Sequence, residues 1–472
     1  MATGLAFAFY LGVGAIADAQ TSDRFLLTIL HTNDLHGHIY PFAYTEVGKS
    51  KEENESVGGA ARRATLVRAL RKGIKNPVIL VDSGDTFTRG PLTNFYEGVA
   101  DVEAMNAVGY DIAALGNNEF KAKDGIEIDD AAGAQSALLR VVKRAKFPWL
   151  CANATDSSGA SLQGVQPYIV REIDGVRVGF LGLTAPRSAK YPQVKGWKIL
   201  DPISTAKEWI PKARKECDIL IAMTHIGVDL DKELASKTTG LDAIVGGDSH
   251  TFLYKLEEAS NLDGVKIPIV QDGEFGVNLG RFDLAFHKNS EGKWTLGEYK
   301  DVLIPISAKL KEATDVVLKL APYRAPYDAV VGHFTQPIAS TSEGRDLQTA
   351  KTICDAMRAE TESDFAINEV ADGLFEVFRH REVTQYEVHA IMPFKNNVIT
   401  TKLTGVEIKK LMADSKKTAV SGDLASLSDT KSYSVAMVDH AAQSTYILSA
   451  DKFTDTGRDV RDVVVSYLSK QR

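Results

Sequence analysis

Short apolar runs and amphipathic segments alternate along residues 25–305. A short run that is almost wholly apolar indicates a buried β-strand, and apolar residues three and four apart indicate a helix with one buried face. The apolar runs predict strands at residues 25–30, 77–81, 111–115, 149–152, 176–184, 219–223, 241–245, 267–270 and 282–286. The amphipathic segments predict helices at residues 58–71, 97–108 and 202–216. Strands that alternate with helices predict an α/β fold in which helices cover both faces of a sheet.

Polar residues of the kind that bind metals follow five of these predicted strands: Asp34, His36, Asp85, Asn117, His225 and His250. Ligands of such folds bind beyond the carboxyl ends of the strands, so side chains at several strand ends meet at one site. Aspartate and asparagine also favour turns after strands, and we interpret Asp82 in that way. That interpretation fails for the set as a whole, because chance does not place such residues at five strand ends.

These residues predict a metal site that holds more than one ion. No cysteine lies among them, so carboxylate oxygens and imidazole nitrogens point to manganese, iron, zinc or magnesium. Asp85 is the natural carboxylate to bridge two ions. Two ions about 4 Å apart can generate hydroxide and stabilise both oxygens of an in-line displacement, which suits phosphoester hydrolysis.

A second domain is predicted after the last of these strands. A helical pattern over residues 307–320, ended by Pro322, predicts a helix that links two domains. Further helices and strands are predicted at residues 347–359, 364–367, 398–403 and 405–412. The chain therefore divides into a tail or signal peptide, a first domain, a linker helix and a second, smaller α/β domain, at residues 1–24, 25–305, 306–325 and 326–472.

Composition narrows the class of protein. A net charge of -7 over 472 residues argues against nucleic-acid binding, and no apolar run is long enough to cross a bilayer. Residues 4–17 are apolar and lead into Ala17-Asp18-Ala19, which is typical of a cleaved secretory signal, although a disordered apolar tail is the alternative. We therefore predict a secreted or periplasmic protein rather than a cytoplasmic one. Three widely spaced cysteines form no disulfide framework, and we expect Cys151 and Cys217, which lie at or beside apolar strands, to be buried.

Several short motifs resemble those of the 5'-nucleotidase family, whose N-terminal domain is a calcineurin-like metallophosphoesterase. They are Asn-Asp-Leu-His-Gly-His, Gly-Gly-x-Ala-Arg-Arg, Asp-Ser-Gly-Asp-Thr, Gly-Asn-x-Glu-Phe, Thr-His-x-Gly and Gly-Gly-x-Ser-His. A fainter similarity continues through Met392-Pro-Phe394 and residues 403–408 in the second domain. The resemblance implies a metallophosphoesterase sheet sandwich flanked by helices and a second domain that binds the substrate.

The resemblance also implies roles for individual residues. Two groups of ligands would each hold one divalent ion. Asp34, His36 and His250 would hold the first, and Asn117, His225 and Asp248 would hold the second. The carboxylate of Asp85 would bridge the two ions. Asp248 stands where the family usually has a histidine, and a carboxylate favours harder ions, so manganese is favoured over zinc.

The catalytic dyad of the family is replaced in this chain. Where the family has Gly-Asn-His-Glu-Phe-Asp, this chain has Asn118 in place of the histidine and Lys121 in place of the final aspartate. An amide at the catalytic position donates a hydrogen bond to developing charge but cannot transfer a proton. Loss of a positioned general acid typically costs about two to four orders of magnitude in rate, so we predict slow turnover.

The substrate pocket of the second domain also departs from the family. The resemblance implies substrate contacts at Arg345, Asn368, Phe394 and His440, although Arg345 as a solvated surface residue and Phe394 as core packing are alternatives. Phe375 or a neighbour stands where the family has a loop arginine.

We therefore predict a two-metal phosphoester hydrolase that acts on a small phosphate ester, in the family a nucleotide. A metal-bound binding or structural protein with feeble activity on the same scaffold is the alternative. The substrate, the native metal and the oligomeric state stay open.

Overall fold

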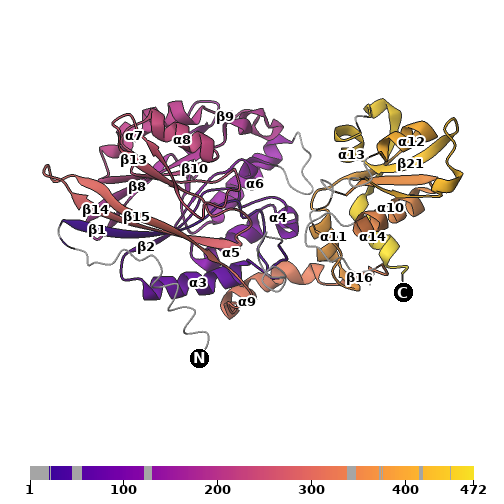
Figure 1. Cartoon of the computed structure of the whole chain (residues 1–472), viewed down its shortest axis with the longest axis horizontal. Helices are drawn as coiled ribbons and strands as arrows, with labels where there is room; N and C mark the ends of the chain where they lie inside the picture. The colour runs from indigo at the N-terminus through magenta and orange to yellow at the C-terminus, as the bar shows by residue number, and fades with distance from the viewer. Residues whose placement is uncertain are drawn as a thin grey trace. The chain divides into compact units, whose positions relative to one another are not determined.

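The computed structural model divides the chain into two compact units (Figure 1). It describes residues 21, 23–44, 56–121, 130–336, 347–370, 374, 376–413, 418–446 and 448–471. The first unit comprises Met1–Phe42 and Ser50–Ala321, and the second comprises Ala43–Lys49 and Pro322–Arg472. The signal-like segment at residues 4–17 and its proposed cleavage site lie outside the described residues.

The first unit contains two large sheets. One has the strand order β15-β14-β1-β2-β3-β4-β6, with bounds Trp294–Pro305, Asn278–Lys288, Arg24–Thr32, Val78–Asp82, Ile112–Ala114, Trp149–Leu150 and Val165–Gln166. The other has the order β12-β13-β11-β10-β8-β7, with bounds Glu257–Ser260, Lys266–Val270, Ala243–Val245, Ile219–His225, Val176–Thr184 and Tyr168–Ile173. Apolar side chains from both sheets form one buried cluster, so the sheets pack face to face.

Helices cover the outer faces of this sandwich. The helices α7 (Pro202–Arg214) and α8 (Val228–Lys237) pack on the second sheet through a cluster that includes Ile210 and Leu234. On the opposite side of the unit lie α3 (Ala60–Gly73) and α5 (Val99–Val108) (Figure 1). The helices α4 (Pro91–Tyr96) and α6 (Ala131–Arg144) both contact α5. This arrangement confirms the predicted sheet sandwich flanked by helices.

Strand direction sets the position of the candidate site. The strands β1, β2, β3 and β4 are parallel in one sheet, and β8, β10, β11 and β13 are parallel in the other. The carboxyl ends of parallel strands meet at one edge of their sheet. The predicted metal ligands lie at the carboxyl ends of β1, β2, β3, β10 and β11: His225 is the last residue of β10, and the others lie in the loops that follow their strands.

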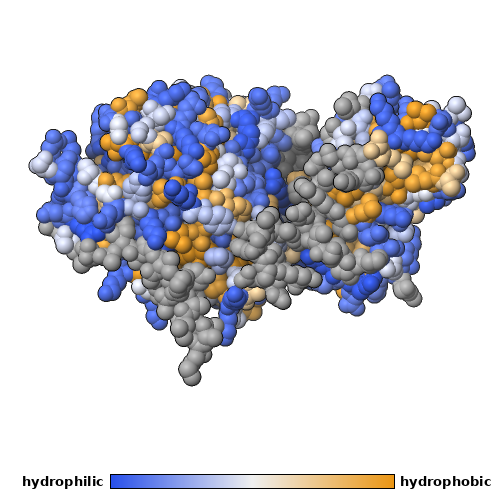
Figure 2. Space-filling view, viewed as in Figure 1, coloured by the Kyte–Doolittle hydropathy of each residue, from blue (hydrophilic) through white to orange (hydrophobic). Residues whose placement is uncertain are grey.

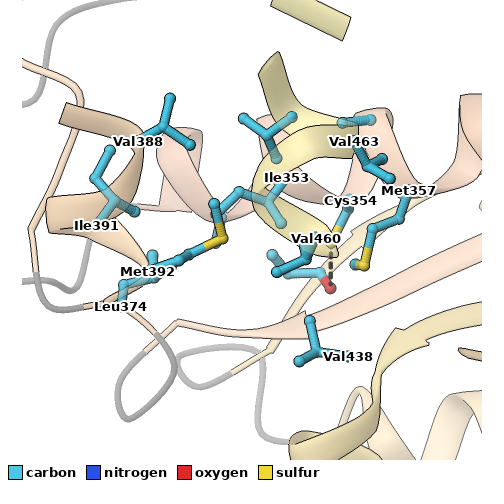
Figure 3. Packing of buried hydrophobic residues seen from close by; sticks show 14 of the residues in the cluster. Ile353, Cys354, Met357, Leu374, Val388, Ile391, Met392, Val438, Val460 and Val463 are labelled. Atoms are coloured by element: carbon cyan, nitrogen blue, oxygen red, sulfur yellow. Dashed lines mark hydrogen bonds between the residues drawn. The ribbon is translucent and has the colours of Figure 1, made fainter. Parts of the chain in front are cut away.

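The second unit is built on a sheet with the order β20-β17-β21-β19-β22, with bounds Thr418–Ser421, Phe365–Glu369, Ser432–Val438, Asn397–Thr404 and Phe453–Asp459. Three helices share one apolar cluster with this sheet: α10 (Leu347–Thr361), α11 (Gln385–Ile391) and α14 (Val460–Leu468). Figure 3 shows Ile353 and Met357 of α10 beside Val460 and Val463 of α14. On the other face lie α12 (Gly405–Leu411) and α13 (Asp439–Ser444).

The cysteines behave as small buried residues. Cys151 and Cys217 are buried as predicted, Cys354 is buried too, and all three are free. The thiol of Cys354 donates to the carbonyl of Ala419 at 3.5 Å inside the cluster of Figure 3. Figure 2 shows hydrophilic residues over much of the visible surface of the first unit. Within the described ranges, no helix is both long enough and apolar enough to cross a membrane.

The prediction for the linking helix is wrong in its bounds. The helix α9 runs over Thr314–Arg324, so residues 307–313 lie outside it and Pro322 lies inside it. A proline removes one backbone hydrogen bond, and in the last turn of a helix that loss affects a single carbonyl near the end. Pro322 therefore does not end α9 where the sequence pattern predicted.

Candidate metal centre

The strand-end loops of the first unit bring the predicted ligands together. Oδ1 of Asp34 lies 3.2 Å from Nε2 of His250 and 3.7 Å from Nε2 of both His36 and His225. The carboxylate of Asp85 lies between the same rings, with Oδ2 at 3.7 Å from His36 and Oδ1 at 3.2 Å from His225. The ligand atoms therefore form two trios, and within each trio they all lie within 4.8 Å of one another. The trios are Asp34, His36 and His250; and Asp34, Asp85 and His225.

Each imidazole presents the same nitrogen to the centre. Nδ1 of His36 contacts the carbonyl of Phe87 at 3.1 Å, Nδ1 of His225 contacts the carbonyl of Ser83 at 2.8 Å, and Nδ1 of His250 contacts Glu274. A partner on Nδ1 fixes the tautomer and ring orientation and leaves Nε2 as the ligand atom.

Two buried ligand atoms also show that the site fits a cation. Nε2 of His225 and Oδ1 of Asp34 are buried, and neither has a hydrogen-bond partner in the described structure. A buried polar atom without a partner is costly, and a bound metal ion would satisfy both.

The backbone at the ligands is held in an uncommon conformation. The φ angles of Asp34, His36, Asp85, Asp248 and His250 are 51°, 46°, 56°, 84° and 52°. Such left-handed residues cost about 1–3 kcal/mol each and concentrate at functional sites. Backbone bonds between loops hold them in place: the amide of Asp34 donates to Gly84 at 2.9 Å, and that of His36 donates to Asp85 at 3.0 Å.

Electrostatics at the centre favour bound positive charge. Burial raises the pKa of Asp34 and Asp85, but the attraction of His225 and other imidazole contacts outweigh it and hold both pKa values below the usual range. Burial lowers the pKa of His36 to about 3, so this ring is neutral and able to bind a metal at pH 7. The pKa of His250 is raised to about 9, because contacts with Asp34 and Glu274 outweigh its burial. The carboxylates of Asp34 and Asp85 are therefore charged at pH 7, which suits a site for a cation.

Asn118 contacts the central carboxylate. Its backbone amide donates to Oδ1 of Asp85 at 2.7 Å, and its side-chain amide donates to Oδ2. The neighbouring Glu119, which we did not predict as a site residue, accepts from the amides of Gly116 at 2.6 Å, Asp85 at 2.9 Å and Phe87 at 3.1 Å. The position of Glu119 in the Gly-Asn-x-Glu motif could have identified it as a site residue. Asn118 orients Asp85, and Glu119 fixes the loops that carry both.

Arg187 is a second residue that sequence reasoning missed. Its guanidinium donates to Oδ2 of Asp248 at 2.5 Å and to Oδ1 of Asn117 at 2.5 Å, and it also pairs with Oδ1 of Asp248. Oδ1 of Asp248 lies 3.4 Å from Nε2 of His225. Two of the predicted ligands of the second ion are therefore shared with a guanidinium. Arg187 follows β8, so the rule that found the other residues at strand ends would have found it.

An open cavity of about 390 Å³ opens onto these groups. Predicted ligands line it, together with Arg89, Lys121, Arg187 and Tyr191. The cavity therefore combines buried carboxylates and imidazoles with three cationic side chains.

Two parts of the chain match known families. Residues 27–252 match the family model of the calcineurin-like phosphoesterases, and residues 330–429 match that of the 5'-nucleotidase C-terminal domain. The chain joins a calcineurin-like phosphoesterase domain to a 5'-nucleotidase C-terminal domain. This match confirms the resemblance that the motifs indicated.

Individual relatives agree with this family. The trifunctional nucleotide phosphoesterase protein YfkN of Bacillus subtilis is 28% identical over 424 residues, which are 82% of this chain but only 27% of that protein. The 5'-nucleotidase of Bos taurus is 27% identical over 427 residues, 81% of this chain and 71% of that protein. The crystal structure of a 5'-nucleotidase precursor from Thermus thermophilus has a TM-score of 0.68 and 24% identity, and covers 94% of this chain and 96% of that one. At this identity the structural likeness shows the fold alone.

In the 5'-nucleotidase C-terminal domain, three of the four predicted substrate residues lie near one edge of the sheet. Asn368 is buried near the end of β17, which runs parallel to β21. His440 is exposed on α13 just after β21, and Phe394, with 42% of its surface exposed, precedes β19, whose Val398 pairs with Val438 of β21. This exposure argues against Phe394 as plain core packing. Arg345 and Phe375 lie outside the described residues.

Proposed function

We propose that this chain is a metal-dependent phosphoric ester hydrolase that acts on nucleotides and uses two divalent ions. The observation that carries the proposal is the grouping of three Nε2 atoms and two carboxylates into two trios that share Asp34, with every Nδ1 engaged elsewhere. The names of the relatives support the substrate: a nucleotide phosphoesterase and a 5'-nucleotidase.

The residues divide into two ligand sets with one bridge. Asp34, His36 and His250 would hold one ion, Asn117, His225 and Asp248 the other, and Asp85 would bridge them. Bound ions would supply Lewis acidity and a hydroxide nucleophile. The protein side chains fix this arrangement: Glu274 orients His250, and Asn118 holds the carboxylate of Asp85 through two hydrogen bonds. Manganese suits the oxygen-rich second set best.

Asn118 makes the proposed reaction slow. Its amide donates to Asp85 and has no titratable proton to give to a leaving group. Good leaving groups, which need little protonation, should therefore react fastest. Asn118→His should raise kcat by up to about tenfold, which corresponds to about 1.4 kcal/mol of the barrier.

One observation favours a second candidate function, a metal-bound binding or structural protein with feeble activity. Arg187 contacts both Asn117 and Asp248, so the second ion competes with a guanidinium for its ligands. A chain that binds one ion firmly and the second poorly would keep the cavity and lose most of the chemistry.

Turnover of p-nitrophenyl phosphate and of AMP by the manganese-loaded chain separates the two functions. Hydrolysis that depends on manganese, and that Asp85→Asn abolishes, supports the enzyme. Firm metal binding without turnover of either substrate would support the binding protein. The control is Lys143→Asn, on the exposed end of α6, which should behave as the parent does.

The proposal extends to the cellular compartment of the protein and to the bounds of its domains. We propose export to the periplasm or outside the cell, with domains over residues 25–305 and 326–472 joined by 306–325. Mass spectrometry of the mature protein tests export, because cleavage should leave a chain that begins near Gln20. An intact N-terminus recovered from the cytoplasm would contradict it.

A further inference from the structure

Two of the three cations in the cavity have no acidic partner. Arg89 and Lys121 line the cavity with the predicted ligands, and among the described residues no carboxylate lies within ion-pair distance of either. Arg187 differs, because Asp248 balances its charge. Arg89 and Lys121 therefore leave two positive charges facing the cavity.

Each of these two residues is linked to a predicted ligand through one intervening residue. Lys121 Nζ lies 4.9 Å above the ring of Tyr191, whose hydroxyl accepts a hydrogen bond from Asn117 at 3.3 Å. Arg89 follows Thr88, whose hydroxyl lies 3.3 Å from Nδ1 of His36. Thr88 and Arg89 have φ angles of 70° and 68°, so their left-handed turn places Arg89 at the cavity at a cost in backbone strain.

A half-buried ammonium without a counter-ion is unfavourable unless a ligand supplies the charge. Burial lowers the pKa of Lys121 and outweighs the attraction of Asp85 and Glu119, neither of which lies within ion-pair distance of the ammonium. Guanidinium and ammonium groups bind phosphate oxygens through charge-assisted hydrogen bonds. A phosphate ester, which the proposed reaction brings to this cavity, is an anion that such groups bind.

We propose that Arg89 and Lys121 form a phosphate-binding subsite of the first domain, specific for the dianion of a phosphate monoester. This inference rests on the proposed function and deepens it. The two cations hold the non-bridging oxygens of the phosphate at the edge of the metal centre. Lys121 also supplies a positive charge near the position that lost its histidine, without transferring a proton. A phosphodiester carries one charge instead of two, so the subsite favours monoesters.

Binding of inorganic phosphate to the manganese-loaded full chain tests the subsite by calorimetry, without turnover. Lys121→Met should weaken phosphate binding about tenfold, which corresponds to about 1.4 kcal/mol, and Arg89→Met should do the same. Lys121→Arg should keep most of the affinity, because it keeps the charge. Lys143→Met, an exposed lysine on α6, is the matched control and should change nothing. Dimethyl phosphate, a monoanion, should bind more weakly and respond less to Lys121→Met.

Metal content and folding are measured on every variant. Phosphate affinity within about twofold of the parent in Lys121→Met, at parental metal content, would overturn the inference. Lys121→Met alone decides it, because Arg89 lies in a strained turn and its replacement can disturb the loop. A parent that binds phosphate through Lys121 but hydrolyses nothing would overturn the proposed function and leave the subsite standing. Normal turnover by the parent together with unchanged phosphate affinity in Lys121→Met would overturn the subsite and leave the proposed function standing.

Discussion

Arg187 should control how tightly the second ion binds. The change Arg187→Met removes the guanidinium and keeps most of the apolar stem of the side chain. It frees the carboxylate of Asp248 and the amide oxygen of Asn117, which the guanidinium now contacts. A cation that enters the second ligand set would then displace no internal partner. We expect Arg187→Met to tighten binding of the second ion and to leave binding of the first unchanged.

The contacts set the size of the effect. Hydrogen bonds to charged groups contribute about 1.5–3 kcal/mol where solvent is excluded. The side chain of Arg187 is 47% exposed and that of Asp248 is 9% exposed. Solvent screening brings such a pair toward the surface value of about 1 kcal/mol or less. We therefore expect a gain in affinity of up to about fivefold, near 1 kcal/mol.

The assay is a calorimetric titration of the metal-free chain with manganese, supported by elemental analysis at defined free metal. The parent should bind one ion tightly and the other more weakly. In Arg187→Met the difference between the two affinities should be smaller. Lys190→Met is the control, because this exposed lysine lies in the same short helix, Pro186–Lys190, and has no ion-pair partner among the described residues. Equal second-ion affinity in the parent and Arg187→Met would refute the competition that we infer.

Three further predictions address other parts of the chain. Asp85→Asn should reduce the affinity for both ions, whereas His36→Ala should weaken chiefly one, and elemental analysis that finds two firm ions in Asp85→Asn would contradict the bridge. Phe394→Ala should raise KM for a nucleotide by the equivalent of about 1–3 kcal/mol and leave an aryl phosphate nearly unaffected; equal effects on both would assign Phe394 to packing. Burial and the neighbouring Arg461 lower the pKa of His389 to about 3, so below pH 6.5 the unfolded chain binds a proton that the folded chain does not. Stability should therefore fall by about 2 kcal/mol from pH 7 to pH 5, and denaturant titrations of His389→Asn should show a smaller fall.

The grouping of the proposed ligands could be predicted from the sequence because one rule relates them. Apolar runs mark buried strands, and parallel strands bring their carboxyl ends to one edge, so Asp34, Asp85 and His225 could be grouped without knowledge of their contacts. The strand over Val176–Thr184 was predicted with the bounds that β8 has in the structure. Contacts that depend on the course of a loop could not be predicted, and the pairing of Arg187 with Asp248 is the clearest example.

The two ends of the linking segment show a second limit. Apolar spacing over residues 307–320 matches a helix, but those residues alone do not define where the first turn closes, and α9 begins only at Thr314. At the other end, Pro322 predicts a break that the structure does not have, because a terminal turn can lack one hydrogen bond. Periodicity therefore identified the element, whereas its limits depend on local backbone bonds that no spacing rule describes.

The left-handed backbone of the ligand loops restricts what can replace a ligand. Aspartate, asparagine and histidine adopt positive φ more readily than most residues, and all three can bind a metal through oxygen or nitrogen. Backbone and chemistry thus select from nearly the same short set of amino acids. At Asp34, with φ of 51°, Asp34→Asn removes a charge while the loop keeps its shape, whereas Asp34→Glu keeps the charge and strains the loop. Glutamate keeps the charge of aspartate and would ordinarily be the more conservative replacement. At this position Asp34→Glu should destabilise the fold more than Asp34→Asn does. A lineage of such chains can therefore lose ligand charge at its aspartates through asparagine, one position at a time, without added strain in the loops.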